Sequence, residues 1–322
     1  MAGKGLPKIA VLDDYQRVAM KMADWSALKN RAEITVFHDH VDDPENVAAR
    51  LEPFTVVCAM RERTPLSGAV LRQLPYCELI VSTGRRNAAI DLEAAKELGI
   101  TVCHTGYTAH GASEATWALI LGLVRHLPAE ASSLRGGGWQ VAVGGDLEGR
   151  TLGLLGLGNL GARVAKVGQA FGMKTIAWSQ NLTGDKAAAA GVTLVSKEQL
   201  FRDSDILSVH LVLSPRTRGL VGAADLALMK PGALFVNTSR GPIVDEAALV
   251  DVLKRRKIAG AALDVYDTEP LAAKSPFRSL ENVLATPHIG FVTQQTYEIF
   301  YRDTVENIVA WLDGKPIRVM EA

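Results

Sequence analysis

The sequence has no segment that could cross a membrane and no excess of charge of either sign. Its longest apolar run, from Thr116 to Val124, ends at Arg125 and is far shorter than the roughly 20 residues that a membrane-spanning helix needs. Lysines and arginines number 35, and so do aspartates and glutamates. Because nucleic acids and anionic membranes select for basic surfaces, we expect neither of them as a partner.

Cysteine is scarce as well. The three cysteines, Cys58, Cys77 and Cys103, are widely spaced and odd in number, a pattern that favours reduced thiols over a disulfide framework. Residues 1–7 carry no apolar stretch of the kind found in secretory signals. We therefore expect a cytoplasmic protein, and we predict no metal site.

A linker rich in proline, serine and glycine is also missing, although a chain of 322 residues is long enough for two cores. Short apolar runs instead alternate with helical stretches, in two series separated by the glycines of residues 135–139. This alternation indicates parallel sheets covered on both faces, so we expect two α/β domains. The runs lie at 8–15, 33–40, 55–60, 78–84 and 100–106, then at 151–156, 174–179, 205–211, 232–237, 258–265 and 282–288, with single helices expected at 112–134 and 293–312.

A glycine-rich turn opens the second series. Gly156, Gly158 and Gly161 have the G-x-G-x-x-G spacing between an apolar run and a helical stretch at 160–171. In that context the first glycine allows a tight turn, the second lets a pyrophosphate approach the backbone, and the third lets the helix pack closely. Leu160, Val164, Val167 and Phe171 fall on one face of this helix, and Gly172 lies where a C-cap belongs. The sequence therefore predicts a dinucleotide site.

The acidic residue that normally follows such a turn by about 20 positions is missing. Ser179 and Gln180 stand at the end of the next strand, and the first acid is Asp185. Without a carboxylate there is no charge to repel a 2′-phosphate, and Lys186 or Arg216 could supply positive charge. This favours NADP over NAD. The alternative is that NAD binds with weaker ribose contacts.

Three ionisable residues each follow an apolar strand of the second series, where open α/β sheets bind ligands. They are Arg240, Glu269 and His288. Each alone has an ordinary structural explanation, as a surface ion-pair partner, a solvated loop acid or a strand-end histidine. Together they supply an anion clamp, a carboxylate and a titratable acid or base, which is what hydride transfer to a 2-oxo acid requires.

The motifs around these residues resemble the D-isomer-specific 2-hydroxyacid dehydrogenase family, which includes glyoxylate/hydroxypyruvate reductases. The matching stretches are strongest from about residue 100 to 295. They are GLGNLG (156–161), SDILSVHLVLSPRTRGL (204–220), MKPGALFVNTSRGPIVDEAAL (229–249), GAALDVYDTEPL (260–271) and TPHIG (286–290).

The resemblance implies an NAD(P)-dependent D-2-hydroxyacid dehydrogenase with two doubly wound parallel-sheet domains and an active cleft between them. A flavodoxin-like substrate domain would comprise residues 1–103 and 291–322, and an inserted Rossmann domain residues 104–290. It implies a homodimer that acts on a small 2-oxo or 2-hydroxy acid. The implied catalytic residues are Arg240, Glu269 and His288, and the implied cofactor-binding residues are Gly156, Gly158, Asn159, Leu160, Gly161, Ser179, Gln180, His210, Arg216, Thr238 and Asp264.

The substrate carboxylate would be held by Arg240 and by backbone N–H groups of Gly84, Arg85 and Arg86. In the family, small residues often stand where this chain has the two arginines. These side chains would either favour a second anionic group on the substrate or face solvent. Two other functions remain open at this point: a dinucleotide-sensing binding module of the corepressor type, and oxidation of phosphite, which uses a similar Arg/Glu/His set.

Overall fold

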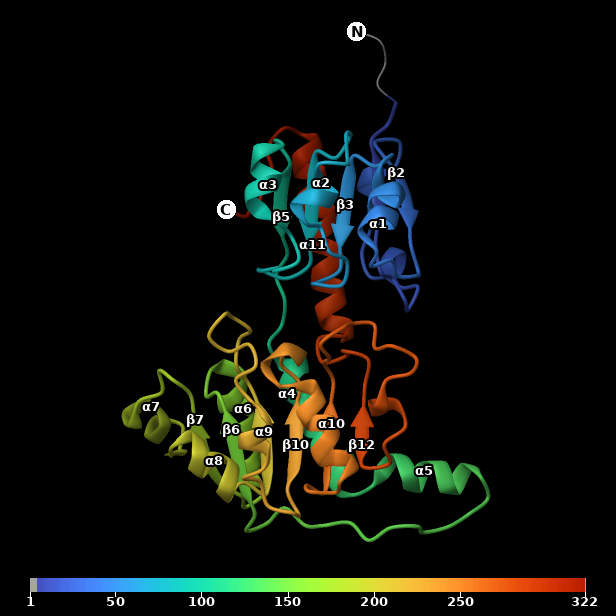
Figure 1. Ribbon diagram of the computed structural model, residues 1–322. Coiled ribbons are helices and arrows are strands. Elements are labelled where there is room, and N and C mark those ends of the chain that lie inside the picture. The colour runs from blue at the N-terminus through green and yellow to red at the C-terminus, as the bar shows by residue number, and fades with distance from the viewer. Residues whose placement is uncertain (1–4, 322) are drawn as a thin grey trace. The chain divides into compact units, whose positions relative to one another are not determined.

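Residues 5–321 are described by the computed structural model, and they form two units (Figure 1). One unit contains the chain up to Thr108 and from Thr293 onward, and the other is Ala109–Val292. The sequence places the boundaries at 103/104 and 290/291. In the structure, the first unit extends to Thr108, and the Gly106 N–H donates to Asp303 within it. Residues 1–4 and 322, at the ends of the predicted substrate domain, lie outside the described part.

The first unit is built on a fully parallel five-stranded sheet in the order β2-β1-β3-β4-β5. This is the flavodoxin strand order, as predicted. The predicted final helix is confirmed as α11, which the Thr293 side chain caps at its N-terminus and which packs on β4. The elements are β1 (Lys8–Val11), η1 (Ala19–Lys21), η2 (Ser26–Leu28), β2 (Glu33–Val36), α1 (Pro44–Leu51), β3 (Val56–Ala59), α2 (Gly68–Leu71), β4 (Leu79–Ser82), α3 (Leu92–Glu97), β5 (Thr101–His104) and α11 (Gln294–Leu312).

The second unit contains a seven-stranded parallel sheet in the order β12-β11-β10-β9-β6-β7-β8. Counted from β6, this is the Rossmann order extended by one strand, as predicted. Both faces of the sheet are buried, since neighbouring residues Ile206 and Leu207 on β9 belong to two different apolar cores. The elements are α4 (His110–Val124), α5 (Leu127–Arg135), β6 (Thr151–Leu155), α6 (Asn159–Ala170), β7 (Lys174–Trp178), α7 (Gly184–Ala189), β8 (Thr193–Leu194), α8 (Lys197–Asp203), β9 (Ile206–Val209), α9 (Ala223–Leu226), β10 (Leu234–Asn237), η3 (Gly241–Ile243), α10 (Glu246–Lys254), β11 (Gly260–Leu263), η4 (Pro276–Arg278) and β12 (Val283–Ala285).

The single helix predicted over 112–134 is wrong. The chain forms α4 and α5 instead, with a break at Arg125 and a left-handed backbone at His126, φ +52°. Pro128 lies in the first turn of α5. A proline is tolerated there because the first N–H groups of a helix have no intrahelical partner. In the middle of one continuous helix it would remove a hydrogen bond and clash with the preceding turn, so the helix breaks before it. None of the helices in the described part of the chain is both long and apolar enough to span a membrane.

The predicted apolar face of α6 is only partly correct. Val164 is buried, but the side chains of Val167 and Phe171 are 39% and 40% exposed. The helix turns small residues toward the sheet: a Cβ added to Gly168 would lie 2.7 Å from the Leu152 Cδ2 atom. The buried face of α6 is therefore the one whose small residues let the helix pack closely on β6, not the most hydrophobic one. The predicted glycine at the C-terminus is confirmed, with Gly172 at φ +72° just after the C-cap.

Candidate functional site

The glycine-rich turn connects β6 to α6 at the point where the strand order of the second unit reverses. Gly156 has a φ of +107°, and a Cβ at this position would lie 2.7 Å from the His210 carbonyl oxygen. A Cβ on Gly161 would lie 2.2 Å from the Gly156 carbonyl oxygen. Both positions therefore require glycine, one for its backbone conformation and the other for close packing.

The outer side of this turn is open. Gly158 and Asn159 are exposed, and a Cβ on Gly158 would meet no heavy atom within 4 Å. Helix α6 begins at Asn159 without a side-chain cap, so its first N–H groups, including those of Leu160 and Gly161, lack intrahelical partners. Free N–H groups and the positive end of the helix dipole suit a pyrophosphate. The turn therefore fits a dinucleotide.

Two other residues of the predicted cofactor set lie at the ends of neighbouring strands. His210 directly follows β9, and its Nε2 atom lies 2.9 Å from the Ser208 Oγ atom. Burial lowers the pKa of His210 to about 4, so the imidazole is neutral at neutral pH. Thr238 follows β10, with its Oγ1 atom 2.7 Å from that of Thr116 on α4. Both side chains are thereby fixed by neutral hydrogen bonds.

Ser179 lies directly after β7, where a dinucleotide fold usually carries its acid. It is half-buried, whereas Gln180 and Arg216 are exposed. The Leu182 N–H donates to the Ser179 carbonyl oxygen at 3.1 Å and closes a turn. The first acidic residue, Asp185, comes later, in the first turn of α7. The end of β7 thus presents a hydroxyl and an amide.

Arg240, Glu269 and His288 follow β10, β11 and β12, which are adjacent parallel strands of one sheet. The carboxyl ends of such strands meet at one edge, so the structure gathers the three predicted catalytic residues at that edge. His288 lies beyond β12, which ends at Ala285, rather than closing the strand as the sequence suggested.

His288 and Glu269 form an oriented pair. The His288 Nδ1 atom lies 2.5 Å from the Glu269 Oε2 atom, and the two side chains are 19% and 26% exposed. The other carboxylate oxygen, Oε1, accepts the Tyr266 N–H at 2.9 Å. Because Glu269 engages Nδ1, the Nε2 atom is the one through which His288 can exchange a proton with a ligand.

Asp264 anchors the segment that carries His288. Its carboxylate is 1% exposed and accepts the Thr286 hydroxyl at 2.6 Å and the N–H groups of Ile289 and Gly290, both at 2.8 Å. Burial raises the pKa of Asp264, and these three donors oppose that effect. The bonds surround His288, whose backbone is left-handed at φ +52°. Asp264 therefore holds the whole loop that carries His288.

Arg240 lies in a loop that is packed directly against the loop of Glu269. A Cβ on Gly241 would lie 2.0 Å from the Tyr266 carbonyl carbon, so the two backbones touch. The Arg240 Nη1 atom donates to the Ser239 carbonyl oxygen at 2.7 Å. The Asp267 N–H donates to the Glu246 carboxylate on α10 at 3.1 Å and ties the loops together once more.

Tyr266 is a contributor to this site that the sequence did not reveal. It is buried, its N–H holds Glu269, and its hydroxyl donates to the carbonyl oxygens of Leu263 and Thr286 at 3.2 and 2.9 Å. It therefore braces the Glu269 loop against the His288 loop. The only local signal was an aromatic residue three positions before the glutamate. Among residues 5–321, no group of three or more His, Cys, Asp or Glu side chains could hold a metal ion.

Gly84, Arg85 and Arg86, the predicted substrate-binding residues, belong to the other unit and follow β4. Gly84 has a φ of +83°, a left-handed conformation that favours glycine. The side chains of Arg85 and Arg86 are exposed. The Gly84 N–H donates to the Thr105 hydroxyl at 2.8 Å and is already engaged within the unit.

Residues 117–290 match the family model described as "D-isomer specific 2-hydroxyacid dehydrogenase, NAD binding domain". The chain is 40% identical over 256 residues to a glyoxylate reductase of Aeropyrum pernix, with 76% of each chain covered. It is 34% identical over 286 residues to a hydroxypyruvate reductase of Thermotoga maritima, covering 87% of this chain and 92% of that one. A solved structure of a phosphoglycerate oxidoreductase from Vibrio cholerae has a TM-score of 0.91 at 39% identity, with coverages of 96% and 100%.

Proposed function

Because the chain belongs to the D-isomer specific 2-hydroxyacid dehydrogenase family, we propose that Arg240, Glu269 and His288 carry out its reaction. The protein is an oxidoreductase that transfers a hydride between a nicotinamide dinucleotide and a small 2-oxo or 2-hydroxy acid. The observation that carries the assignment of residues is the His288–Glu269 pair, which leaves the Nε2 atom of His288 for the substrate.

Each catalytic residue has a separate task. The nicotinamide supplies the hydride when the cofactor is bound. The Arg240 guanidinium binds the substrate carboxylate with its planar fork and polarises the neighbouring carbonyl group. His288 donates a proton from Nε2 to the alkoxide that develops on reduction, and it accepts that proton in the oxidising direction. Glu269 holds the imidazole in place through its contact with the Nδ1 atom, so that Nε2 faces the substrate.

The residues of the glycine-rich turn would hold the cofactor. Gly156, Gly158 and Gly161 shape the turn, while Asn159 and Leu160 begin the helix whose N–H groups face the pyrophosphate. We assign His210, Thr238 and Asp264 to the nicotinamide end, because they follow β9, β10 and β11 next to the catalytic residues. On this assignment Ala109–Val292 is the nucleotide domain, and the remaining residues form the substrate domain.

We further propose that the preferred cofactor is NADPH. The support is the position after β7, where Ser179 and Gln180 offer neutral hydrogen-bonding groups, and Arg216 is a candidate for pairing with a 2′-phosphate. The substrate class is a short 2-oxo acid such as glyoxylate or hydroxypyruvate, on which the relatives named above act. The proposed substrate-binding groups are the Arg240 guanidinium in one unit and, in the other, the backbone N–H groups of Arg85 and Arg86, because the Gly84 N–H is already engaged by Thr105.

Steady-state oxidation of NADPH and NADH, side by side with glyoxylate and hydroxypyruvate, tests this proposal. We expect a higher kcat/KM with NADPH. Ser179→Asp should lower kcat/KM for NADPH about 10- to 100-fold, because a carboxylate beside the 2′-phosphate costs of the order of 2 kcal/mol. Ser179→Ala, which removes the hydroxyl but adds no charge, serves as the control and should lower kcat/KM for NADPH far less than Ser179→Asp. A native preference for NADH would contradict the assignment of NADPH.

The alternatives left open by the sequence, a corepressor-type binding module and a phosphite dehydrogenase, are not favoured, since the relatives named above are reductases that act on 2-oxo acids.

We also propose that the protein is a cytoplasmic homodimer. Cys58, Cys77 and Cys103 are free and buried, as suits a reducing compartment. The α5 region of the nucleotide unit has no buried residue and is followed by Trp139, which is 73% exposed. Exposed apolar surface of this kind marks interfaces.

A further inference from the structure

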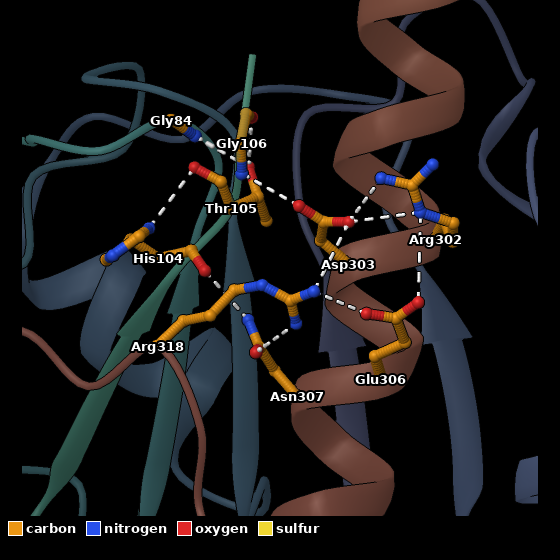
Figure 2. A network of polar contacts seen from close by, with 9 residues as sticks. All are labelled: Gly84, His104, Thr105, Gly106, Arg302, Asp303, Glu306, Asn307 and Arg318. Atoms are coloured by element: carbon orange, nitrogen blue, oxygen red, sulfur yellow. Dashed lines mark hydrogen bonds and ion pairs between the residues drawn. The ribbon is translucent and has the colours of Figure 1, made fainter.

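A network of buried polar contacts connects the 84–86 loop to helix α11 within the first unit (Figure 2). It begins at the Gly84 N–H, passes through Thr105 and Gly106, and ends at the carboxylate of Asp303. Residues 84, 105 and 303 are far apart in the sequence, and none of these contacts belongs to the catalytic set. The network leads from the predicted carboxylate-binding loop to the end of the unit where the chain passes into Ala109.

The Thr105 hydroxyl lies at the centre of this network. Thr105 is fully buried at the end of β5; its Oγ1 atom accepts the Gly84 N–H at 2.8 Å and donates to the Gly106 carbonyl oxygen at 2.9 Å. The hydroxyl therefore fixes the direction of one N–H group of the loop. Within the described residues, the next two N–H groups, those of Arg85 and Arg86, form no hydrogen bond. Successive backbone N–H groups without a partner are the donors from which anion-binding sites are built.

Asp303 holds the other end of the network in place. Its carboxylate is buried, and its Oδ2 atom accepts the Gly106 N–H at 2.8 Å. The second oxygen, Oδ1, accepts from Arg302 at 2.8 Å and lies 3.7 Å from the Arg318 guanidinium. A buried carboxylate with charged partners on one oxygen and a backbone N–H on the other is fixed in one orientation. Figure 2 shows Asp303 reaching from α11 to the segment after β5.

We propose that Thr105 is a positioning residue for the substrate carboxylate, acting through Gly84 and secured by Asp303. By engaging the Gly84 N–H, it turns the N–H groups of Arg85 and Arg86 outward as the pair that binds the carboxylate. The inference rests on the proposed function, because it concerns the loop that this function assigns to the substrate. It predicts that the Thr105 hydroxyl controls the affinity for the 2-oxo acid and leaves cofactor binding unchanged.

The test compares Thr105→Val, Thr105→Ser and Thr108→Val. Valine keeps the shape of threonine but leaves the buried Gly84 N–H without an acceptor, which the loop can remedy only by turning. Serine keeps the hydroxyl. Thr108 is a matched control, because its hydroxyl lies in the same segment but bonds Thr296, 2.9 Å away, and does not contact the 84–86 loop. For each variant we would measure KM and kcat with glyoxylate, the dissociation constant of NADPH, Tm, and the affinity of the NADPH-saturated enzyme for oxamate, an unreactive 2-oxo acid mimic.

We expect Thr105→Val to raise KM for glyoxylate about tenfold and to weaken oxamate binding in proportion. The change in kcat should be less than about threefold, and NADPH binding should be unaffected. Thr105→Ser should restore native values, and Thr108→Val should keep them even if its Tm falls. Equal effects of the two valine variants, or unchanged oxamate binding in Thr105→Val, would overturn the inference. A native enzyme that binds oxamate without reducing any 2-oxo acid would contradict the proposed function alone, because the oxamate comparison would still decide the role of Thr105.

Discussion

Replacing His288 by alanine lowers kcat for the reduction of glyoxylate by about 10²–10⁴-fold, the usual contribution of general acid catalysis. The reason is that the proposed mechanism makes the Nε2 atom of His288 the proton donor, with the imidazole held by the contact between its Nδ1 atom and Glu269. The dissociation constant of NADPH should stay within about twofold of the native value, because the glycine-rich turn between β6 and α6 does not include this side chain. Stopped-flow measurement of the chemical step and a fluorescence titration of NADPH check the two parts separately.

His288→Gln is the matched variant for this prediction. Glutamine keeps a polar side chain of similar reach beside Glu269, but its amide does not transfer protons at neutral pH. Its kcat should therefore be as low as that of His288→Ala, with a better-preserved Tm. A kcat within threefold of the native value in either variant would remove His288 from the mechanism.

Replacing Arg240 by alanine lowers kcat/KM for the 2-oxo acid by about 10²–10³-fold. Removing one partner of a desolvated, hydrogen-bonded charge pair costs about 2–5 kcal/mol. In this variant the substrate carboxylate loses the guanidinium that binds it, and the substrate carbonyl group loses the charge that polarises it. Arg240→Lys keeps the charge but not the planar fork, so its kcat/KM should fall between the native enzyme and Arg240→Ala. Full substrate-saturation curves would separate the effects on KM and kcat.

The Arg240 loop is also closely packed, because Gly241 touches the backbone at Tyr266. Thermal unfolding is therefore needed beside the kinetics. A loss of activity that follows Tm across both Arg240 variants would indicate a structural role. A loss of affinity for oxamate at unchanged Tm is the outcome that the anion clamp predicts.

Features with a local steric cause could be predicted from the sequence. Two of the three glycines of the dinucleotide turn are sterically required, Gly156 by its φ and Gly161 by the small space around it, and the spacing of the motif indicates both. The alternation of strands and helices predicts the parallel sheets, whereas the two strand orders were predicted from the family resemblance. The break at His126 has a local signal too, in Pro128, which the length of the apolar pattern concealed.

Contacts between residues distant in the sequence could not be predicted. Asp264 binds three donors of the His288 loop, more than 20 residues away, and Asp303 binds Gly106 across 197 positions. Each contact depends on which elements the fold brings together, and no periodicity encodes that. The buried face of α6 was misjudged for a related reason. Hydrophobicity favoured Val167 and Phe171, whereas the helix approaches the sheet through the glycine at 168.

The most direct test of the central claim is to identify the product that the native enzyme makes from NADPH and hydroxypyruvate. Cofactor oxidation is followed by absorbance, and the hydroxy acid is resolved by chiral chromatography. We predict one D-2-hydroxy acid formed for each NADPH oxidised. An L-hydroxy acid would contradict the assignment to a D-specific enzyme, and tight NADPH binding without oxidation would contradict hydride transfer to a 2-oxo acid.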